Sequence, residues 1–518
     1  MTENMSDEKV LFLKNKKGVV IILLVLFLLA GIGIRLLDFT DMPLDFAGTR
    51  QLHSLIMTRG FFYQMDTPAT LSMPQDLRDF GINAGKAEPV IEPPLMEYLV
   101  AFIYSLIGGE NIYVGRILSI LFWVIGGIPL FLMARRLMSV NGAFAALAFY
   151  LFTHFGVYAS RSFQPDPMMV MWILWALYFQ IRWSQDDSLK NGILAGIFTG
   201  IAILVKAPSI FFTGIPFAAL VLRKGFKYWI KNWRIYLIAA LAILPAFLYN
   251  FLSATVGGQG GSIFGARFFP QLWIDYKWYL SWLKMLKSVA GHFVLLVSLF
   301  GFFLISRKET RWFYGALWLG YALFSFVFAY HISTHNYYHL PMLPIIALGF
   351  GVVFSMVYSR LEAVNKDWLN RILIAALFVF SYALCLQRVR GSLIATDYRY
   401  EEVYWTELGN KIDRNASVIA LTQDYGYRIN YWGYINPTLW PTSEESTIKN
   451  LQGATDPAFQ QMFKELTAGK TIFLVTIPGE FETQPELKEW LFGNYRYDQG
   501  DGYFIFYLNE PLNSSDQG

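Results

Sequence analysis

The sequence predicts a mainly α-helical protein that crosses a membrane many times and carries a C-terminal α/β domain outside it. Of its 518 residues, 55% are hydrophobic and 15% are charged, whereas about 25% are charged in soluble domains. The mean hydropathy is +0.38. Many long apolar stretches run through the first three quarters of the chain, and the composition becomes that of a soluble domain after residue 387.

The composition also excludes several classes of protein. A disordered chain, a collagen-like chain and an ordinary cytosolic enzyme do not fit it. The net charge of +4 is no signature of nucleic-acid binding, so no nucleic-acid partner is expected. The single cysteine, Cys385, excludes a disulfide framework and a cysteine-based zinc site within one chain.

Eleven stretches are candidate membrane spans. A helix needs about 20 mostly apolar residues to cross a bilayer, and some stretches are shorter, so the expected count is eleven, give or take two. The candidates are 18–37, 111–133, 141–158, 168–182, 191–205, 209–222, 235–252, 288–305, 312–331, 340–358 and 371–386.

Lysine and arginine favour a cytoplasmic N-terminus. In that orientation the inside loops hold 19 of these residues, whereas the much longer outside loops before Gln387 hold about eleven. Eleven spans then place the C-terminus outside. The first span follows basic residues as a signal peptide does, but no small-residue cleavage site succeeds it, so a retained helix is expected. We expect a multi-pass protein of the bacterial inner (plasma) membrane with an extracytoplasmic C-terminal domain.

Two outside segments are too long to be simple connectors. The expected domains are a transmembrane domain, 1–387, whose first extracytoplasmic loop is 38–110, and an extracytoplasmic α/β domain, 388–518. The glycine-rich stretch 257–261 indicates a flexible loop or, alternatively, a lid over a substrate, and the tail 513–518 is expected to be disordered. Helices are expected at 49–60, 95–107, 456–466 and 484–492, and strands at 416–422, 470–476 and 503–508.

Ionisable residues gather at the expected outer ends of the spans, where they mark function because charge near a membrane is costly. Paired acids suit proton transfer or metal binding, and Arg and Lys suit a phosphate leaving group. These segments face the same side and are predicted to converge on one outer cavity. The residues are Asp45, Arg50, Arg59, Glu92, Arg161, Asp166, Lys206, His331, His335 and His339.

Each of these residues also has a structural interpretation. Asp45 is placed to cap a helix over 46–57, and Asp166 precedes a proline at a helix start. Arg161 suits contact with lipid headgroups, and Lys206 suits snorkelling to the interface. The loop with His331, His335 and His339 suits a zinc site, but residues spaced four apart also lie on one face of a helix. At this point the residues leave both interpretations open.

Six short motifs then occur in a fixed order along the chain. They are Asp45 followed by Arg50 and Arg59, Glu92-Pro-Pro-Leu, Gly115-Arg-Ile-Leu through Ala134-Arg-Arg-Leu, Arg161 with Pro165-Asp-Pro, Val205-Lys-Ala-Pro, and Tyr337-Tyr-His-Leu-Pro. With this topology the chain resembles the GT-C superfamily of membrane glycosyltransferases. More narrowly, it resembles the bacterial branch related to protein O-mannosyltransferases and to the lipid A aminoarabinose transferase.

The resemblance implies an inverting transfer of a sugar from a polyprenyl-phosphate-sugar donor to a lipid, glycan or protein acceptor at the outer membrane face. It implies no certain cofactor and leaves a divalent metal open, with Asp45, Asp166 and His335 as ligands if one is present. The implied roles are catalytic for Asp45 and Asp166, donor phosphate binding for Arg59, Arg161 and Lys206, and substrate lining for Arg50, Glu92, His335, Tyr337, Tyr338 and His339.

Three other functions fit a membrane protein of this composition. A transporter or flippase of lipid-linked saccharides would need charges in mid-span and usually internal repeats, and both are sparse here. A polymerase or ligase of surface polysaccharide shares lipid-linked substrates. A non-catalytic assembly protein would use the outer domain for binding only.

Overall fold

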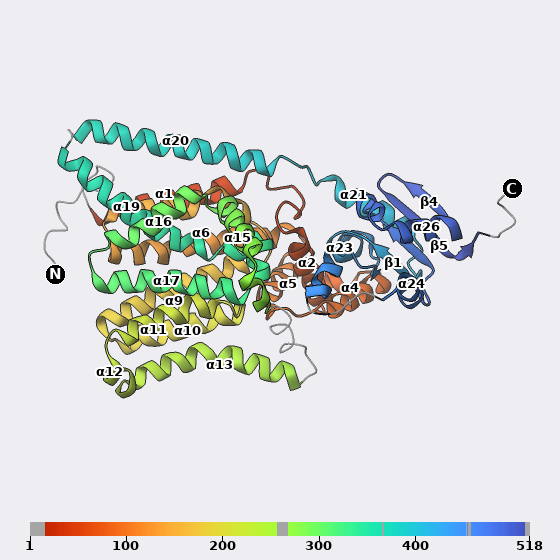
Figure 1. The fold of residues 1–518 in the computed structure, drawn as a ribbon, viewed down its shortest axis with the longest axis horizontal. Coiled ribbons are helices and arrows are strands. Elements are labelled where there is room, and N and C mark those ends of the chain that lie inside the picture. Colours follow the sequence, from red (N-terminus) through yellow and green to blue (C-terminus); the bar gives the residue numbers. More distant parts are fainter. Residues whose placement is uncertain (1–15, 256–267, 365–366, 452, 454–456, 513–518) are drawn as a thin grey trace. The chain divides into compact units, whose positions relative to one another are not determined.

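The computed structural model describes residues 16–255, 268–364, 367–451, 453 and 457–512. The expectations for 257–261 and for the tail 513–518 lie outside these residues. The chain forms two compact units (Figure 1). Unit 1 comprises Met1–Phe39, Val90–Met96 and Tyr113–Thr396, and unit 2 comprises Thr40–Pro89, Glu97–Ile112 and Asp397–Gly518. Most of the first outer loop therefore belongs to the same unit as the C-terminal segment.

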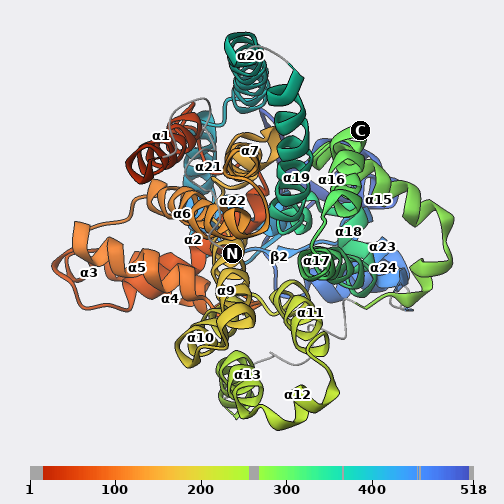
Figure 2. The ribbon, with the colours of Figure 1, turned by 90° about the vertical axis from the view of Figure 1, so that its left-hand side faces the viewer.

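Unit 1 is a bundle of helices, seen largely end-on in Figure 2. A helix lies at every stretch expected to span the membrane. The helices are α1 (Lys17–Arg35), α6 (Tyr113–Leu137), α7 (Val140–Phe152), α8 (His154–Ala159), α9 (Asp166–Asp186), α10 (Leu189–Val205), α11 (Ser209–Leu222), α12 (Phe226–Lys231), α13 (Trp233–Thr255), η1 (Pro270–Ile274), α15 (Tyr276–Val289), α16 (His292–Leu304), α17 (Lys308–Val327), α18 (Ala329–Thr334), η2 (Asn336–His339), α19 (Met342–Val364) and α20 (Asp367–Leu393).

Length and composition alone qualify five helices of the described residues as membrane spans, or six if the bent pair α15 and α16 is one span. The remaining apolar helices are shorter or more polar, such as α7 with 13 residues and α11 with 14. The protein is thus a multi-pass, mostly helical membrane protein, and the count of eleven spans stays a prediction.

Helices α13 and α20 lie at the margin of unit 1, and α15 lies across α16. α13 and α20 flank the bundle in Figure 2, and few of their side chains are buried. α15 meets α16 at 92°, and Gly291 between them has a φ of +80°, which glycine adopts without strain. One face of α15 is buried, and its Trp278 indole donates a hydrogen bond to the Ala329 carbonyl at 2.6 Å.

Unit 2 combines helices with a five-stranded sheet in the order β2-β1-β3-β5-β4. β1 pairs in parallel with β2 and β3, and β5 pairs antiparallel with β3 and β4. The sheet core is apolar and includes Ile419, Phe473 and Phe506, which lie opposite one another across three strands. The strands are β1 (Val418–Leu421), β2 (Thr438–Leu439), β3 (Ile472–Val475), β4 (Tyr495–Gly500) and β5 (Tyr503–Pro511).

The helices of unit 2 come from both its loop segments and its C-terminal part. Where α2 crosses α4, a Cβ atom on Gly60 would lie 2.9 Å from the Gly85 Cα, so only glycine allows this approach. The helices are α2 (Gly48–Tyr63), α3 (Pro68–Leu71), α4 (Gln75–Ala87), α5 (Leu95–Ile107), α21 (Tyr400–Lys411), η3 (Asp424–Gly426), α22 (Tyr427–Gly433), α23 (Ser443–Leu451), α24 (Phe459–Thr467), α25 (Pro478–Glu482) and α26 (Pro485–Asn494).

Candidate functional site

A buried lysine of unit 1 forms the centre of the candidate site. α10 ends at Val205, and Lys206 takes an extended conformation before Pro208 begins the next turn. The Lys206 Nζ lies 3.0 and 2.9 Å from the two carboxylate oxygens of Asp166, in the first turn of α9. Both side chains are nearly inaccessible, at 6% and 1% exposure. Lys206 therefore does not snorkel to solvent but is held in an internal ion pair.

A second carboxylate and two aromatic rings complete this cluster. The Glu92 Oε1 lies 3.8 Å from the Lys206 Nζ, and its side chain is 14% exposed. The ammonium also lies 5.5 Å from the ring centre of Tyr337 and 5.3 Å from that of Tyr338, within the range of cation–π attraction. The fold thus brings together predicted residues from four separate segments, and we call these five residues the lysine cluster.

The two carboxylates of the lysine cluster differ in their contact with the ammonium. Asp166 makes the closer contact and is the less exposed acid, so it is the fixed partner of Lys206. Glu92 is farther away and more accessible.

The histidine loop contacts the lysine cluster through Tyr338. The rings of His331 and His335 lie 5.0 and 6.1 Å from that of Tyr338. His339 instead is fully buried, with its Nδ1 2.7 Å from the Tyr321 hydroxyl and its Nε2 2.9 Å from the Ile332 carbonyl. Burial lowers the pKa of His339 to about 4, so a neutral His339 fixes the position of η2 rather than facing a substrate.

Arg161 has partners other than those expected of a phosphate ligand. Its side chain is fully buried, and the guanidinium donates hydrogen bonds to the carbonyls of Leu37 and Asp38. Arg116 likewise donates to the Phe39 carbonyl at 2.7 Å. These contacts anchor the backbone that leaves α1, because buried carbonyls need donors. The phosphate role of Arg161 therefore stays a prediction from the sequence.

Asp45 lies in unit 2, where it does not cap a helix. α2 begins at Gly48, and its N-cap is Ala47, whose φ is 49° and which makes no side-chain cap. The Asp45 carboxylate is 9% exposed and accepts a hydrogen bond of 3.3 Å from the Gln51 amide. The capping interpretation of Asp45 is therefore wrong. Arg50, on the same helix, is partly exposed, and its charge acts on Tyr427.

Arg59 is the centre of a second buried charge pair, also in unit 2. Its Nε lies 3.0 Å from the Glu110 carboxylate, and its Nη1 donates to the Tyr431 carbonyl. The guanidinium also stacks on the rings of Tyr431 and Tyr434, at 3.9 and 5.0 Å. The predicted phosphate ligand is thus engaged in an internal network of unit 2.

Comparisons with known proteins agree with this architecture. Residues 91–251 match the family model described as dolichyl-phosphate-mannose-protein mannosyltransferase. No curated protein matches the chain. Among solved structures, ArnT from Cupriavidus metallidurans bound to undecaprenyl phosphate is 13% identical with a TM-score of 0.59, covering 95% of this chain and 98% of ArnT. The chain has the GT-C fold. The resemblance expected from the sequence motifs is confirmed.

A second GT-C structure also aligns with nearly the whole chain. The apo oligosaccharyltransferase of Archaeoglobus fulgidus is 14% identical with a TM-score of 0.55, covering 96% of this chain and 76% of its own. Its complex with an inhibitory peptide and a dolichol-phosphate gives the same TM-score at 13% identity. That alignment covers 97% of this chain and 75% of the oligosaccharyltransferase. Together with the family model, this fold supports a glycosyltransferase.

The described residues of this GT-C protein contain no group of three or more His, Cys, Asp or Glu side chains placed to hold a metal ion. The three predicted ligands Asp45, Asp166 and His335 remain candidates from sequence only.

The Arg59 network leads to a stability prediction. Arg59→Met leaves the Glu110 carboxylate, 20% exposed, without its cation, which costs about 3 kcal/mol or more for a buried pair. Lys488→Met is the control, because its pair with Glu482 is exposed on both sides, at 36% and 63%, and such pairs contribute about 1 kcal/mol or less. We expect a clearly larger drop in melting temperature for Arg59→Met. Equal drops would contradict the structural role of this pair.

A carboxylate that sequence reasoning did not single out, Glu88, is buried at the end of α4. Its side chain is 7% exposed, its Oε2 lies 3.6 Å from the His53 Nε2, and Tyr427 hydrogen-bonds to it. Burial raises the pKa of Glu88 from 4.5 to about 7, and the Tyr427 bond opposes this effect. No motif marks this residue, since its burial results from packing between distant segments of unit 2.

Glu88 predicts a pH dependence of stability. Between pH 4.5 and about 7 the folded protein holds a proton that the unfolded chain has lost, so the free energy of unfolding falls as pH rises through this window. The loss is at most about 3 kcal/mol. Melting temperatures across this range should decline less for Glu88→Gln than for wild type, with the exposed acid variant Glu489→Gln as control. An unchanged slope in Glu88→Gln would refute this assignment.

Proposed function

We propose that this protein transfers a sugar from a polyprenyl-phosphate-sugar to an acceptor hydroxyl at the outer face of a bacterial inner membrane. The observation that carries the proposal is the lysine cluster, in which Lys206 is held by Asp166 beside the accessible Glu92. The family model is named for a dolichyl-phosphate-mannose donor. Two solved proteins of this fold are described with undecaprenyl phosphate and dolichol-phosphate.

In the proposed reaction, Lys206 binds the phosphate of the donor. The bond between the anomeric carbon and the phosphate oxygen breaks, and negative charge grows on that oxygen. A fixed cation stabilises this growing charge more strongly in the transition state than in the ground state. Asp166 positions the ammonium, and Tyr337 and Tyr338 enclose it. The lipid phosphate departs and stays in the membrane.

The acceptor is activated by a carboxylate in this proposal. Asp45 takes the proton of the acceptor hydroxyl while its oxygen forms the new bond to the anomeric carbon. One displacement of this kind inverts the anomeric configuration. The hydrogen bond from Gln51 orients the Asp45 carboxylate within unit 2. Arg50, Glu92 and His335 are proposed to line the substrate, and the acceptor is a lipid, a glycan or a protein.

The distribution of lysine and arginine supports the proposed orientation, with the N-terminus cytoplasmic and unit 2 outside. The test is transfer of label from a set of radiolabelled polyprenyl-phosphate sugars in proteoliposomes of the purified protein. Incorporation from one donor, with an inverted anomeric linkage in the product, is expected. Movement of a labelled lipid across the bilayer without any transfer would instead indicate a flippase.

A further inference from the structure

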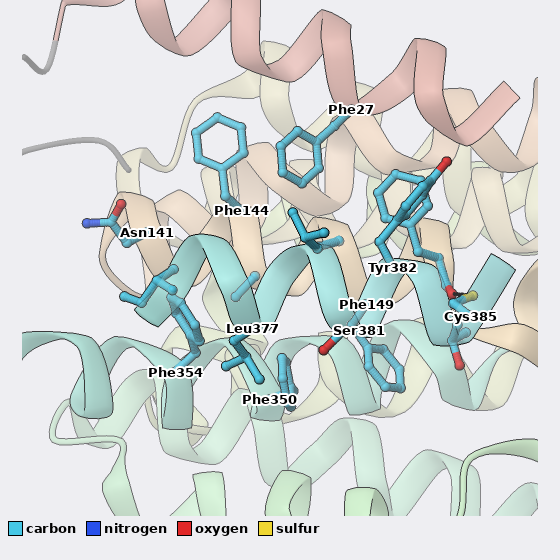
Figure 3. Close-up of a pocket in the computed structure, with 16 residues that line it drawn as sticks. Phe27, Asn141, Phe144, Phe149, Phe350, Phe354, Leu377, Ser381, Tyr382 and Cys385 are labelled. Carbon is cyan, nitrogen blue, oxygen red and sulfur yellow. Dashed lines mark hydrogen bonds between the residues drawn. The ribbon is translucent and has the colours of Figure 1, made fainter. Parts of the chain in front are cut away.

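A large cavity lies among four helices of unit 1, separate from the lysine cluster. It has a volume of about 490 Å³ and lies between α1, α7, α19 and α20. Figure 3 shows Phe27 and Phe144 near each other, and the ring of Phe149 packs against that of Phe350. None of the residues of the lysine cluster lines it. The proposed reaction leaves this cavity without a role.

The lining favours hydrocarbon over water. A buried water needs two to four polar partners, whereas cavities lined by Leu, Ile and Phe stay dry and bind apolar molecules. Here most of the lining is aromatic or aliphatic, and the polar residues Asn141, Thr153, Ser381 and Tyr382 are a minority of it. A dry cavity of this size would forfeit much contact energy if it stayed empty.

The volume indicates the size of the occupant. A cavity of about 150 Å³ holds one benzene ring, so 490 Å³ holds a chain on the order of 18 carbon atoms. This is the length of one acyl chain of a bilayer lipid and is far shorter than a polyprenyl tail. Leu377 lines the cavity and is also 57% exposed. A chain can therefore enter from the surface of the helix bundle beside α20.

One end of the cavity has a positive group nearby. Cys385 lines the cavity, and Arg388 and Ser392 follow it on one face of α20 at helical spacing. Ser392 bonds to His154 of α8 at 2.8 Å, so this face turns toward α8. The Arg388 side chain is exposed, and no acidic side chain pairs with it among the residues that the structure describes. A negative headgroup fits beside it.

We propose that this cavity binds one acyl chain of an anionic glycerophospholipid, whose phosphate lies at Arg388. The lipid fills the space that α20 leaves beside α7 and α19. It is a structural lipid of the fold and not the donor, since no residue of the lysine cluster lines this cavity. This inference does not depend on the proposed function.

Cys385 allows lipid binding in the cavity to be measured, because it is the only cysteine of the chain. The experiment follows the rate at which N-ethylmaleimide modifies the full-length protein in detergent with added lipid. Phosphatidylglycerol with a 16- and an 18-carbon chain should slow the reaction about fivefold more than phosphatidylcholine with the same chains. This factor is the contribution of one arginine to the binding of an anionic lipid. Equal rates would overturn the proposal. Stronger protection by a polyprenyl phosphate would also overturn it and assign the cavity to the donor.

Two variants separate the chain from the headgroup. Arg388→Gln should remove the preference for phosphatidylglycerol while both lipids still protect Cys385. Ala148→Phe should fill the cavity and abolish protection, whereas Ala240→Phe, at an exposed position of α13, should leave it unchanged. If Ala148→Phe does not fold, native mass spectrometry of the wild type decides. Retention of one phosphatidylglycerol is expected, and retention of none would contradict the proposal.

Discussion

Replacing Lys206 with methionine is expected to lower kcat/KM for sugar transfer by about 100- to 1,000-fold. This is the range found when a group that stabilises transition-state charge is removed. Methionine keeps an unbranched side chain, one heavy atom shorter, but not the ammonium that Asp166 holds in place. The measurement is label transfer from the lipid donor in proteoliposomes, with donor concentration varied so that kcat and KM are separated.

The single variant also leaves Asp166 buried without a cation, which costs stability. The double variant Lys206→Met with Asp166→Asn removes that unpaired charge and should melt closer to wild type while remaining inactive. Activity within about tenfold of wild type in either variant would exclude Lys206 as the phosphate ligand, since its contribution would then be below about 1.4 kcal/mol.

Asp45→Asn is expected to reduce transfer by about 100- to 10,000-fold, the contribution of a general base. The amide oxygen of asparagine still accepts the Gln51 hydrogen bond, so the fold of the loop is kept. Asp66→Asn is the matched control, because Asp66 is a highly exposed acid of the same unit that pairs with Arg78. It should transfer sugar as wild type does. A loss of only a few fold in Asp45→Asn would assign the proton transfer to another group.

Much of the fold could be predicted from local sequence patterns. The segments that form β1 and β3 are apolar and contain β-branched residues, and every residue of both strands is buried. The prediction of these two strands is confirmed. β4 was not predicted, because its residues are mostly polar on a sheet edge, and β2 has only two residues. The break between α7 and α8 at Thr153 was also missed, since an apolar run does not reveal where a helix is interrupted.

The candidate site could be predicted in part. Topology placed Asp166 and Lys206 on the same side, although 40 residues separate them, and the structure pairs them. Arg161, only a few residues from Asp166, was assigned to phosphate. Its actual partners are backbone carbonyls, and sequence does not show whether a cation faces solvent or backbone. Glu88 was missed because its burial depends on long-range packing.

The right angle between α15 and α16 has a consequence for the environment in which the enzyme works. α15 carries lysines on its exposed side and a buried apolar face, as helices that lie in the plane of a membrane interface do. Its Trp278 is bonded to Ala329, a few residues before the tyrosines of the lysine cluster. We therefore expect the turnover rate to change with bilayer thickness, because hydrophobic mismatch would shift the depth at which α15 and the segment bonded to it lie.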